Sequence, residues 1–208
     1  MTFRHLYNHV CELVPANIAG GEAPVSIAQV TKFILDSKEV ETISVHGVDL
    51  HKTLGHIIIY DDRSSPYDGP EYHAHIRFLE SLNKCWARFV TCKEMMHVYD
   101  EPGERTGTRD DFYKLIRDIQ NQVMKDDISP LLNSEFKAEW MALTLLCPKD
   151  MRESFKDQLQ NRTVTTLQVA TELQIPERII PAIMDDYYDE ALERFLRMPP
   201  ALGLVEGI

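Results

Sequence analysis

The sequence lacks any apolar run as long as a membrane span. A transmembrane helix needs about 20 consecutive, mostly apolar residues, and polar residues interrupt every apolar stretch of this 208-residue chain well before that length. The first ten residues, MTFRHLYNHV, also lack the apolar segment of a secretory signal peptide. We therefore expect a cytoplasmic protein with no membrane partner.

Cysteine is scarce, and its spacing forms no recognised motif. None of the four cysteines pairs with another as Cys-x-x-Cys, which argues against a metal or redox motif of that kind. Free thiols in a reducing compartment are expected for Cys11, Cys85, Cys92 and Cys147.

Basic residues are in deficit. The chain has 22 Lys and Arg against 33 Asp and Glu, a net charge of −11. This charge argues against extensive, nonspecific binding to a phosphate backbone. Residues 167–184, LQVATELQIPERIIPAIM, have the rhythm of a helix-turn-helix but carry few basic side chains. A regulator that contacts DNA through residues 163–181 is therefore the weakest function considered, and we do not expect a nucleic-acid partner.

What is present is the composition of a folded protein, with 44% hydrophobic and 26% charged residues. Ser26 is placed to cap a helix whose apolar positions recur at helical spacing. Strand-like segments follow at 41–48, 56–62 and 73–78, and the stretch 63–72, rich in Ser, Pro and Gly, predicts a loop. This order indicates the α+β class, with a small antiparallel sheet packed on helices.

The second half of the sequence is predicted to be helical. A buried helix is expected over 87–99, and Pro and Gly in the segment 100–108 end it. The clearest apolar stripe predicts a helix over 111–124. A further helix is capped by Asn133 or Ser134 and ends before Pro148, and two or three short amphipathic helices follow residue 163.

The segment RFVTCKEMMH, residues 88–97, contains a near match to a zinc-peptidase motif. In His-Glu-x-x-His the two imidazoles lie one turn apart on a helix and bind one zinc ion, while the glutamate acts on the bound water. Here Lys93, Glu94 and His97 occupy the three positions. The glutamate and the second histidine are present, but a lysine replaces the first histidine.

Two segments resemble the ImmA/IrrE family of zinc metallopeptidases. RFVTCKEMMH is similar to the family signature RFTLAHELGH. EFKAEWMALTLLCP, residues 135–148, is similar to the family helix Glu-x-x-Ala-Asn-x-Phe-Ala-x-x-Leu-Leu-x-Pro, from which Glu139 and Met141 depart. The resemblance covers roughly residues 25–150.

The resemblance implies a zincin-like metallopeptidase core. By its pattern Glu94 is the catalytic base, and His97 and Glu135 are metal ligands. Family members are cytoplasmic regulatory proteases, several of which cleave helix-turn-helix repressors. We expect a metallopeptidase-like domain over 1–150, with a helical C-terminal extension over 151–208 packed on it.

Lys93 changes what this site is expected to do. A protonated lysine has no lone pair for a metal, so we expect its ammonium to fill the metal position in a buried ion pair with Glu94 and Glu135. Zinc is then absent or weakly bound. Substitute ligands from Asp100 or Cys92, or from the strand residues His73 and His75, would restore a metal site.

Two functions follow from these alternatives. The first is a regulatory protein of the metallopeptidase fold with a degenerate site, which binds a protein partner, such as a transcriptional repressor, without cutting it. The alternative is an active zinc-dependent endopeptidase that cleaves such a regulatory protein.

Overall fold

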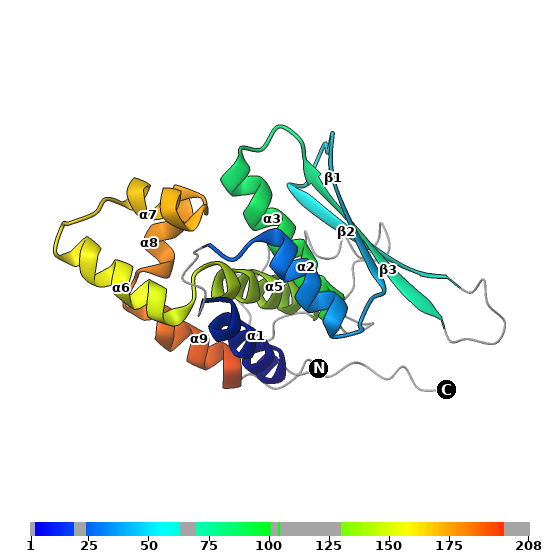
Figure 1. Cartoon of the computed structure of the whole chain (residues 1–208), viewed down its shortest axis with the longest axis horizontal. Helices are drawn as coiled ribbons and strands as arrows, with labels where there is room; N and C mark the ends of the chain where they lie inside the picture. The colour runs from blue at the N-terminus through cyan, green and yellow to red at the C-terminus, as the bar shows by residue number, and fades with distance from the viewer. Residues whose placement is uncertain (1–2, 19–23, 63–69, 101–103, 105–129, 198–208) are drawn as a thin grey trace.

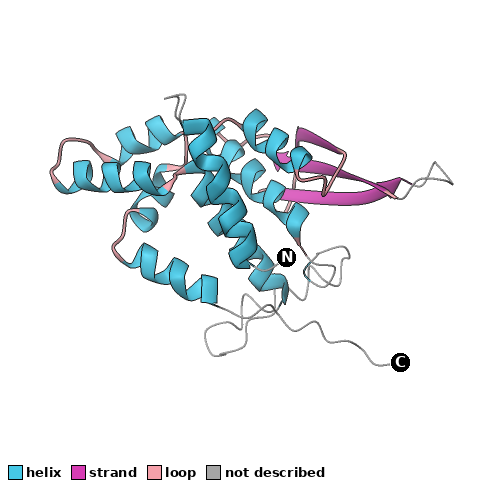
Figure 2. Ribbon diagram, turned by 60° about the horizontal axis from the view of Figure 1, so that its bottom comes forward, coloured by secondary structure: helices cyan, strands magenta, loops and turns pink. Residues whose placement is uncertain are grey.

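The computed structural model describes residues 3–18, 24–62, 70–100, 104 and 130–197. It confirms the α+β class: a small three-stranded sheet lies at one end of the molecule and the helices fill the rest (Figure 1). Figure 2 shows the same two parts from another side. The helix expected over 111–124 lies outside the described residues, as do 63–69 of the expected loop and most of the segment 100–108.

The sheet contains the three expected strands: β1 (Thr42–Val48), β2 (Gly55–Asp62) and β3 (Glu71–Leu79). Their order is β1-β3-β2. β2 and β3 are antiparallel, but β1 and β3 are parallel, with Thr42 opposite His73. The fully antiparallel sheet predicted from the sequence is therefore wrong, because β3 inserts between the two strands that precede it. Alternation along a strand fixes its buried face but not its neighbours.

One face of the sheet packs on helices α2 (Ile27–Asp36) and α3 (Lys84–Met96). Ala74 and Ile76 of β3 point into this interface and are completely buried. α2 begins as predicted, since Ser26 and Gln29 form a reciprocal capping box.

α3 begins at the Asn83 cap, earlier than expected, and ends at Met96. A single 3-10 turn, η1 (His97–Tyr99), follows. The helix expected over 87–99 is thus confirmed in kind, but its end tightens into the 3-10 turn.

α5 (Pro130–Leu146) crosses α3 and packs on α1 (Phe3–Ile18). The prediction that Asn133 or Ser134 caps this helix is wrong, because the helix begins before both residues. Their side chains bind Glu104 and Asp100. These two side chains contact residues distant in sequence, although their position in the sequence favours a helix cap.

The short helices expected after residue 163 are present. They are α7 (Thr166–Leu173), α8 (Ile180–Ile183) and α9 (Tyr187–Arg197), with the 3-10 turn η4 (Glu177–Ile179) before α8. α6 (Lys149–Gln160) precedes them and was not among the helices predicted after residue 163. Arg152, only 2% exposed, donates to both carboxylate oxygens of Asp189 at 2.6 Å and so joins α6 to α9. α9 also packs against α1.

No helix among the described residues combines the length and apolarity needed to cross a bilayer. All four cysteines are free thiols, and Cys92 and Cys147 are buried.

Gly55 lets the start of β2 approach α3 closely. The Cβ of an alanine there would lie 2.4 Å from Val90 Cγ1 and 2.8 Å from Glu94 Oε1. We expect Gly55→Ala to lower the free energy of unfolding by about 1–3 kcal/mol, the usual cost of overpacking. Chemical denaturation measures this change in the free energy of unfolding. Gly47→Ala is the matched control, since its Cβ would come no closer than 3.2 Å to the Phe78 ring and 3.5 Å to Glu80 Cβ. Equal losses in both variants would contradict this explanation.

Candidate functional site

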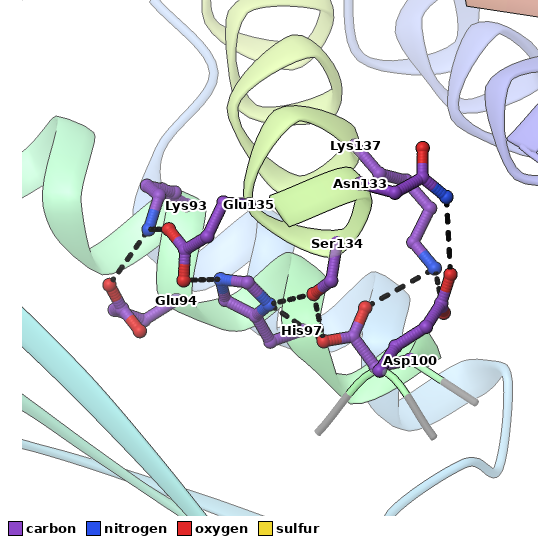
Figure 3. A network of polar contacts seen from close by, with 9 residues as sticks. Lys93, Glu94, His97, Asp100, Asn133, Ser134, Glu135 and Lys137 are labelled. Atoms are coloured by element: carbon purple, nitrogen blue, oxygen red, sulfur yellow. Dashed lines mark hydrogen bonds and ion pairs between the residues drawn. The ribbon is translucent and has the colours of Figure 1, made fainter. Parts of the chain in front are cut away.

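The candidate site lies where the end of α3 meets the first turns of α5. Lys93 and Glu94 come from the last turn of α3, His97 from η1, and Glu135 from α5. Figure 3 shows His97 between two groups of polar side chains, with Lys93, Glu94 and Glu135 on one side of its ring. The two segments that carry the family resemblance are therefore brought together.

The Lys93 ammonium bridges the two glutamates. Its Nζ lies 2.5 Å from Glu135 Oε2 and 3.4 Å from Glu94 Oε1. Burial alone would lower the pKa of Lys93, but the charges of Glu94 and Glu135 outweigh it and raise that pKa. Lys93 is therefore a fixed cation at neutral pH. The expected ion pair is present; that it stands in for a metal ion remains a prediction.

His97 is held from its other side by Asp100. The Nδ1 of His97 lies 2.7 Å from Asp100 Oδ2 and 3.0 Å from Ser134 Oγ, and Ser134 donates to the same Asp100 oxygen at 2.5 Å. Because the carboxylate can only accept, Nδ1 carries the proton. The Nε2 atom therefore faces the opposite group, 3.7 Å from Glu135 Oε1.

The Nε2 atom of His97 is buried and has no hydrogen bond to any described residue. Burial alone would lower the pKa of His97, but the hydrogen bond and charge of Asp100 raise it. Burial acts in the opposite direction on Glu135, whose pKa is nevertheless lowered by Lys93 and His97. These shifts favour an imidazolium flanked by two carboxylates.

A second lysine extends the network. Lys137, 3% exposed, lies 3.2 Å from Asp100 Oδ1 and donates to Glu104 Oε2 at 2.5 Å. Asn133 also donates to Glu104, at 3.4 Å. The sequence assigns Ser134 only to a possible helix cap and predicts no site role for Lys137 or Glu104. Their spacing could have indicated a shared role for Ser134 and Lys137. The two residues lie three positions apart, on either side of Glu135, and so share a face of α5.

No group of three or more His, Cys, Asp or Glu side chains among the described residues could hold a metal ion. Asp100 and Glu135 lie on opposite sides of the His97 ring, so His97, Asp100 and Glu135 do not converge on one point in this arrangement. The ammonium of Lys93 lies between the carboxylates of Glu94 and Glu135.

The other expected substitute ligands are placed elsewhere. Cys92 is fully buried, and burial raises the pKa of its thiol to about 12. A thiol with that pKa is not a ready metal ligand at neutral pH. His73 and His75 alternate with Ala74 and Ile76, which occupy the helix-facing side of β3. The two histidines therefore lie on the far face of the sheet, away from α3.

Nor does the network form a Ser-His-Asp triad. In such a triad the serine approaches one imidazole nitrogen and the carboxylate the other. Here Ser134 and Asp100 share the Nδ1 of His97. Ser134 also donates its own proton to Asp100, so its hydroxyl is not aligned for attack.

No family model, curated protein or solved structure matches this chain. The ImmA/IrrE resemblance therefore depends on the two segments around Glu94 and Glu135 and on their meeting at one site.

Removing the Lys93 ammonium should leave two like charges facing each other. We expect Lys93→Met to lower the free energy of unfolding by about 1–3 kcal/mol, between the values for exposed and fully buried pairs. The double variant Lys93→Met/Glu135→Gln should recover part of that loss, because it also removes the charge of Glu135, one of the two left without a partner. Denaturant titrations measure both. Lys149→Met is the control, since its ion pair with Glu153 is exposed. A Lys93→Met variant no less stable than this control would contradict the expectation.

The network also predicts a pH dependence. Glu135 and Asp100 have lowered pKa values, so their contribution to stability is present above 4.5 and 3.8 respectively and is lost as pH falls through the lowered values. The raised pKa of His97 gives a contribution that is full below 6.5 and is lost as pH rises through the raised value. We expect their joint contribution to be largest between about pH 4.5 and pH 6.5.

Unfolding free energies measured from about pH 3 to about pH 8 test this dependence. Glu135→Gln should reduce the fall in unfolding free energy on the acid side of the curve, relative to the wild-type chain. His97→Gln should reduce the fall on the alkaline side. The slopes are the readout, since each substitution also changes the overall stability. Parallel curves for all three proteins would show that these groups do not cause the dependence.

Proposed function

We propose that the chain is a regulatory protein of the ImmA/IrrE metallopeptidase type, with a zincin-like core and a site closed by Lys93. It acts by binding a protein partner, such as a helix-turn-helix repressor, without cutting it. The observation that carries the proposal is the 2.5 Å distance from Lys93 Nζ to Glu135 Oε2, with Glu94 3.4 Å from the same nitrogen.

An ammonium in this position supplies charge without the chemistry of a metal. A metal ion lowers the pKa of a bound water and polarises a carbonyl oxygen. The Lys93 ammonium has no lone pair or open coordination position, so it balances the two glutamates and generates no nucleophile. Glu94 is then bound to a fixed cation and is not poised to take a proton from water.

The site is still reachable by a partner. The side chains of Lys93 and Glu135 are 18% and 29% exposed, whereas that of Glu94 is 9% exposed. A protein that lies over this surface would contact the ion pair from one side. The chain's net charge of −11 favours a partner with a basic surface.

One observation favours the alternative, an active zinc-dependent endopeptidase. Asp100 holds the Nδ1 of His97 and turns Nε2 toward Glu135, and metal-binding histidines are usually oriented in this way by a carboxylate. This function requires Lys93 to leave the space between the glutamates. The two functions therefore differ in whether the native chain holds zinc.

Zinc content separates the two functions. We expect the chain purified without chelator, then dialysed, to contain little zinc, and Lys93→His to retain about one equivalent, since three protein ligands suffice for a catalytic-type site. Elemental analysis measures both, and Lys93→His/Glu135→Gln should lose the gained zinc. Near-stoichiometric zinc in the native chain that Glu135→Gln removes would instead support the endopeptidase.

Partner binding requires a separate assay. The native chain is mixed with a purified helix-turn-helix repressor, and co-elution on size exclusion and the integrity of the repressor are both measured. A stable complex with intact repressor supports the proposal, whereas zinc-dependent cleavage supports the alternative. Lys93→Glu tests whether the complex uses this surface.

A further inference from the structure

The face of the sheet that points away from α3 is rich in histidine. It is formed by alternate residues of the three strands: Thr42, Ser44, His46, His56, Ile58, Tyr60, His73, His75 and Arg77. We call it the histidine face. It carries four of the chain's eight histidines. None of the described helices packs on it, and Ile58 and Tyr60 are 36% and 43% exposed.

Two of these imidazoles, on neighbouring parallel strands, lie next to each other in an edge-on arrangement. The ring centroids of His46 and His75 are 6.5 Å apart, with 62° between the ring planes. The Tyr60 hydroxyl lies 3.2 Å from the Nε2 of His75 and fixes that ring from the β2 side. His73 is held separately, by a 2.8 Å hydrogen bond between its Nδ1 and Thr42 Oγ1. His46 and His75 are therefore the pair arranged to share a ligand.

Ser44 supplies a second, independent observation. It lies opposite His75 in the strand register and two residues before His46 on the same face. Its hydroxyl oxygen is buried and has no hydrogen-bond partner among the described residues. Buried hydroxyls nearly always have a partner, and an exception calls for an explanation such as a bound water or ion.

We propose that His46 and His75 bind one divalent transition-metal ion, and that Ser44 hydrogen-bonds a water on that ion. Imidazole nitrogen suits Cu²⁺, Ni²⁺ and Zn²⁺. A ligating nitrogen lies about 2.0–2.1 Å from zinc, so the two rings turn toward each other slightly when the ion binds. Water fills the remaining positions, because no described group of three His, Cys, Asp or Glu side chains is available.

The chain's charge assists this binding. The net charge of −11 raises the local concentration of cations at the surface. Two imidazoles with water give a site of moderate affinity that follows the Irving–Williams order, so Cu²⁺ binds more tightly than Ni²⁺ or Zn²⁺. The site is independent of Lys93, because the histidine face and α3 lie on opposite sides of the sheet.

Calorimetric titration of the full chain with Cu²⁺, Ni²⁺ and Zn²⁺ near neutral pH tests the site. We expect one equivalent of Cu²⁺ to bind, and His46→Gln and His75→Gln each to weaken it at least about tenfold, since each removes one of two ligands. His56→Gln, on the same face but on β2, is the matched control and leaves the affinity unchanged.

Paramagnetic broadening gives a structural readout. In the NMR spectrum, bound Cu²⁺ should broaden the ring signals of Tyr60, whose ring centroid lies 5.1 Å from that of His75. The Tyr188 signals, from the helical end of the molecule, should stay sharp. Unchanged binding in both His46→Gln and His75→Gln, or an equal loss in His56→Gln, overturns the proposal.

The metal analysis of Lys93→His remains interpretable beside this site. Zinc held on the histidine face disappears with His46→Gln and is unaffected by the residue at position 93. Zinc held at the α3–α5 site disappears with Glu135→Gln. The two proposals therefore fail or succeed separately.

Discussion

The contact between Lys93 and Glu135 joins the two helices on which the candidate site is built. Without it, Glu94 and Glu135 would have no ammonium between them, and only His97 would lie beside Glu135. The ammonium makes the interface an alternating series of charges, in which each acid lies between cations or beside one: Glu94, Lys93, Glu135, His97, Asp100, Lys137 and Glu104. Removing one member of such a series leaves its neighbours without a compensating charge, which is costly where they are buried.

The sequence predicted the parts of the fold that depend on local patterns. Strand positions followed from short apolar segments between turn residues, and the start of α2 followed from the Ser26 capping box. The direction of β1 relative to β3 could not be predicted, because strand order is decided by packing between distant segments. The true start of α5 was hidden for a similar reason, since Ser134 is a good cap in isolation and binds Asp100 in the fold.

The same distinction applies to the site. The contact of Lys93 with Glu94 and Glu135 could be predicted. The resemblance implied that both glutamates lie at one site, and an ammonium is attracted to carboxylates. The role of Asp100 could not, since a continuous helix was expected and the chain instead forms a 3-10 turn after Met96. That turn directs the Asp100 carboxylate to Nδ1 of His97. The burial of Lys137 depends on Asp100 and Glu104, and Glu104 has no local sequence relation to it.

Arg88 of α3 gives the C-terminal helices an unusual dependence on the rest of the chain. α7 ends at Gln174 in the left-handed region, φ 52°, where glycine would be the unstrained choice. The Arg88 guanidinium donates to the carbonyls of Leu173 and Gln174 and also to that of Val25, so a cation from another helix satisfies the carbonyl end of α7. The end of α7 therefore depends on a side chain from the helix that carries Lys93, and a C-terminal fragment beginning after α5 would contain α7 without Arg88.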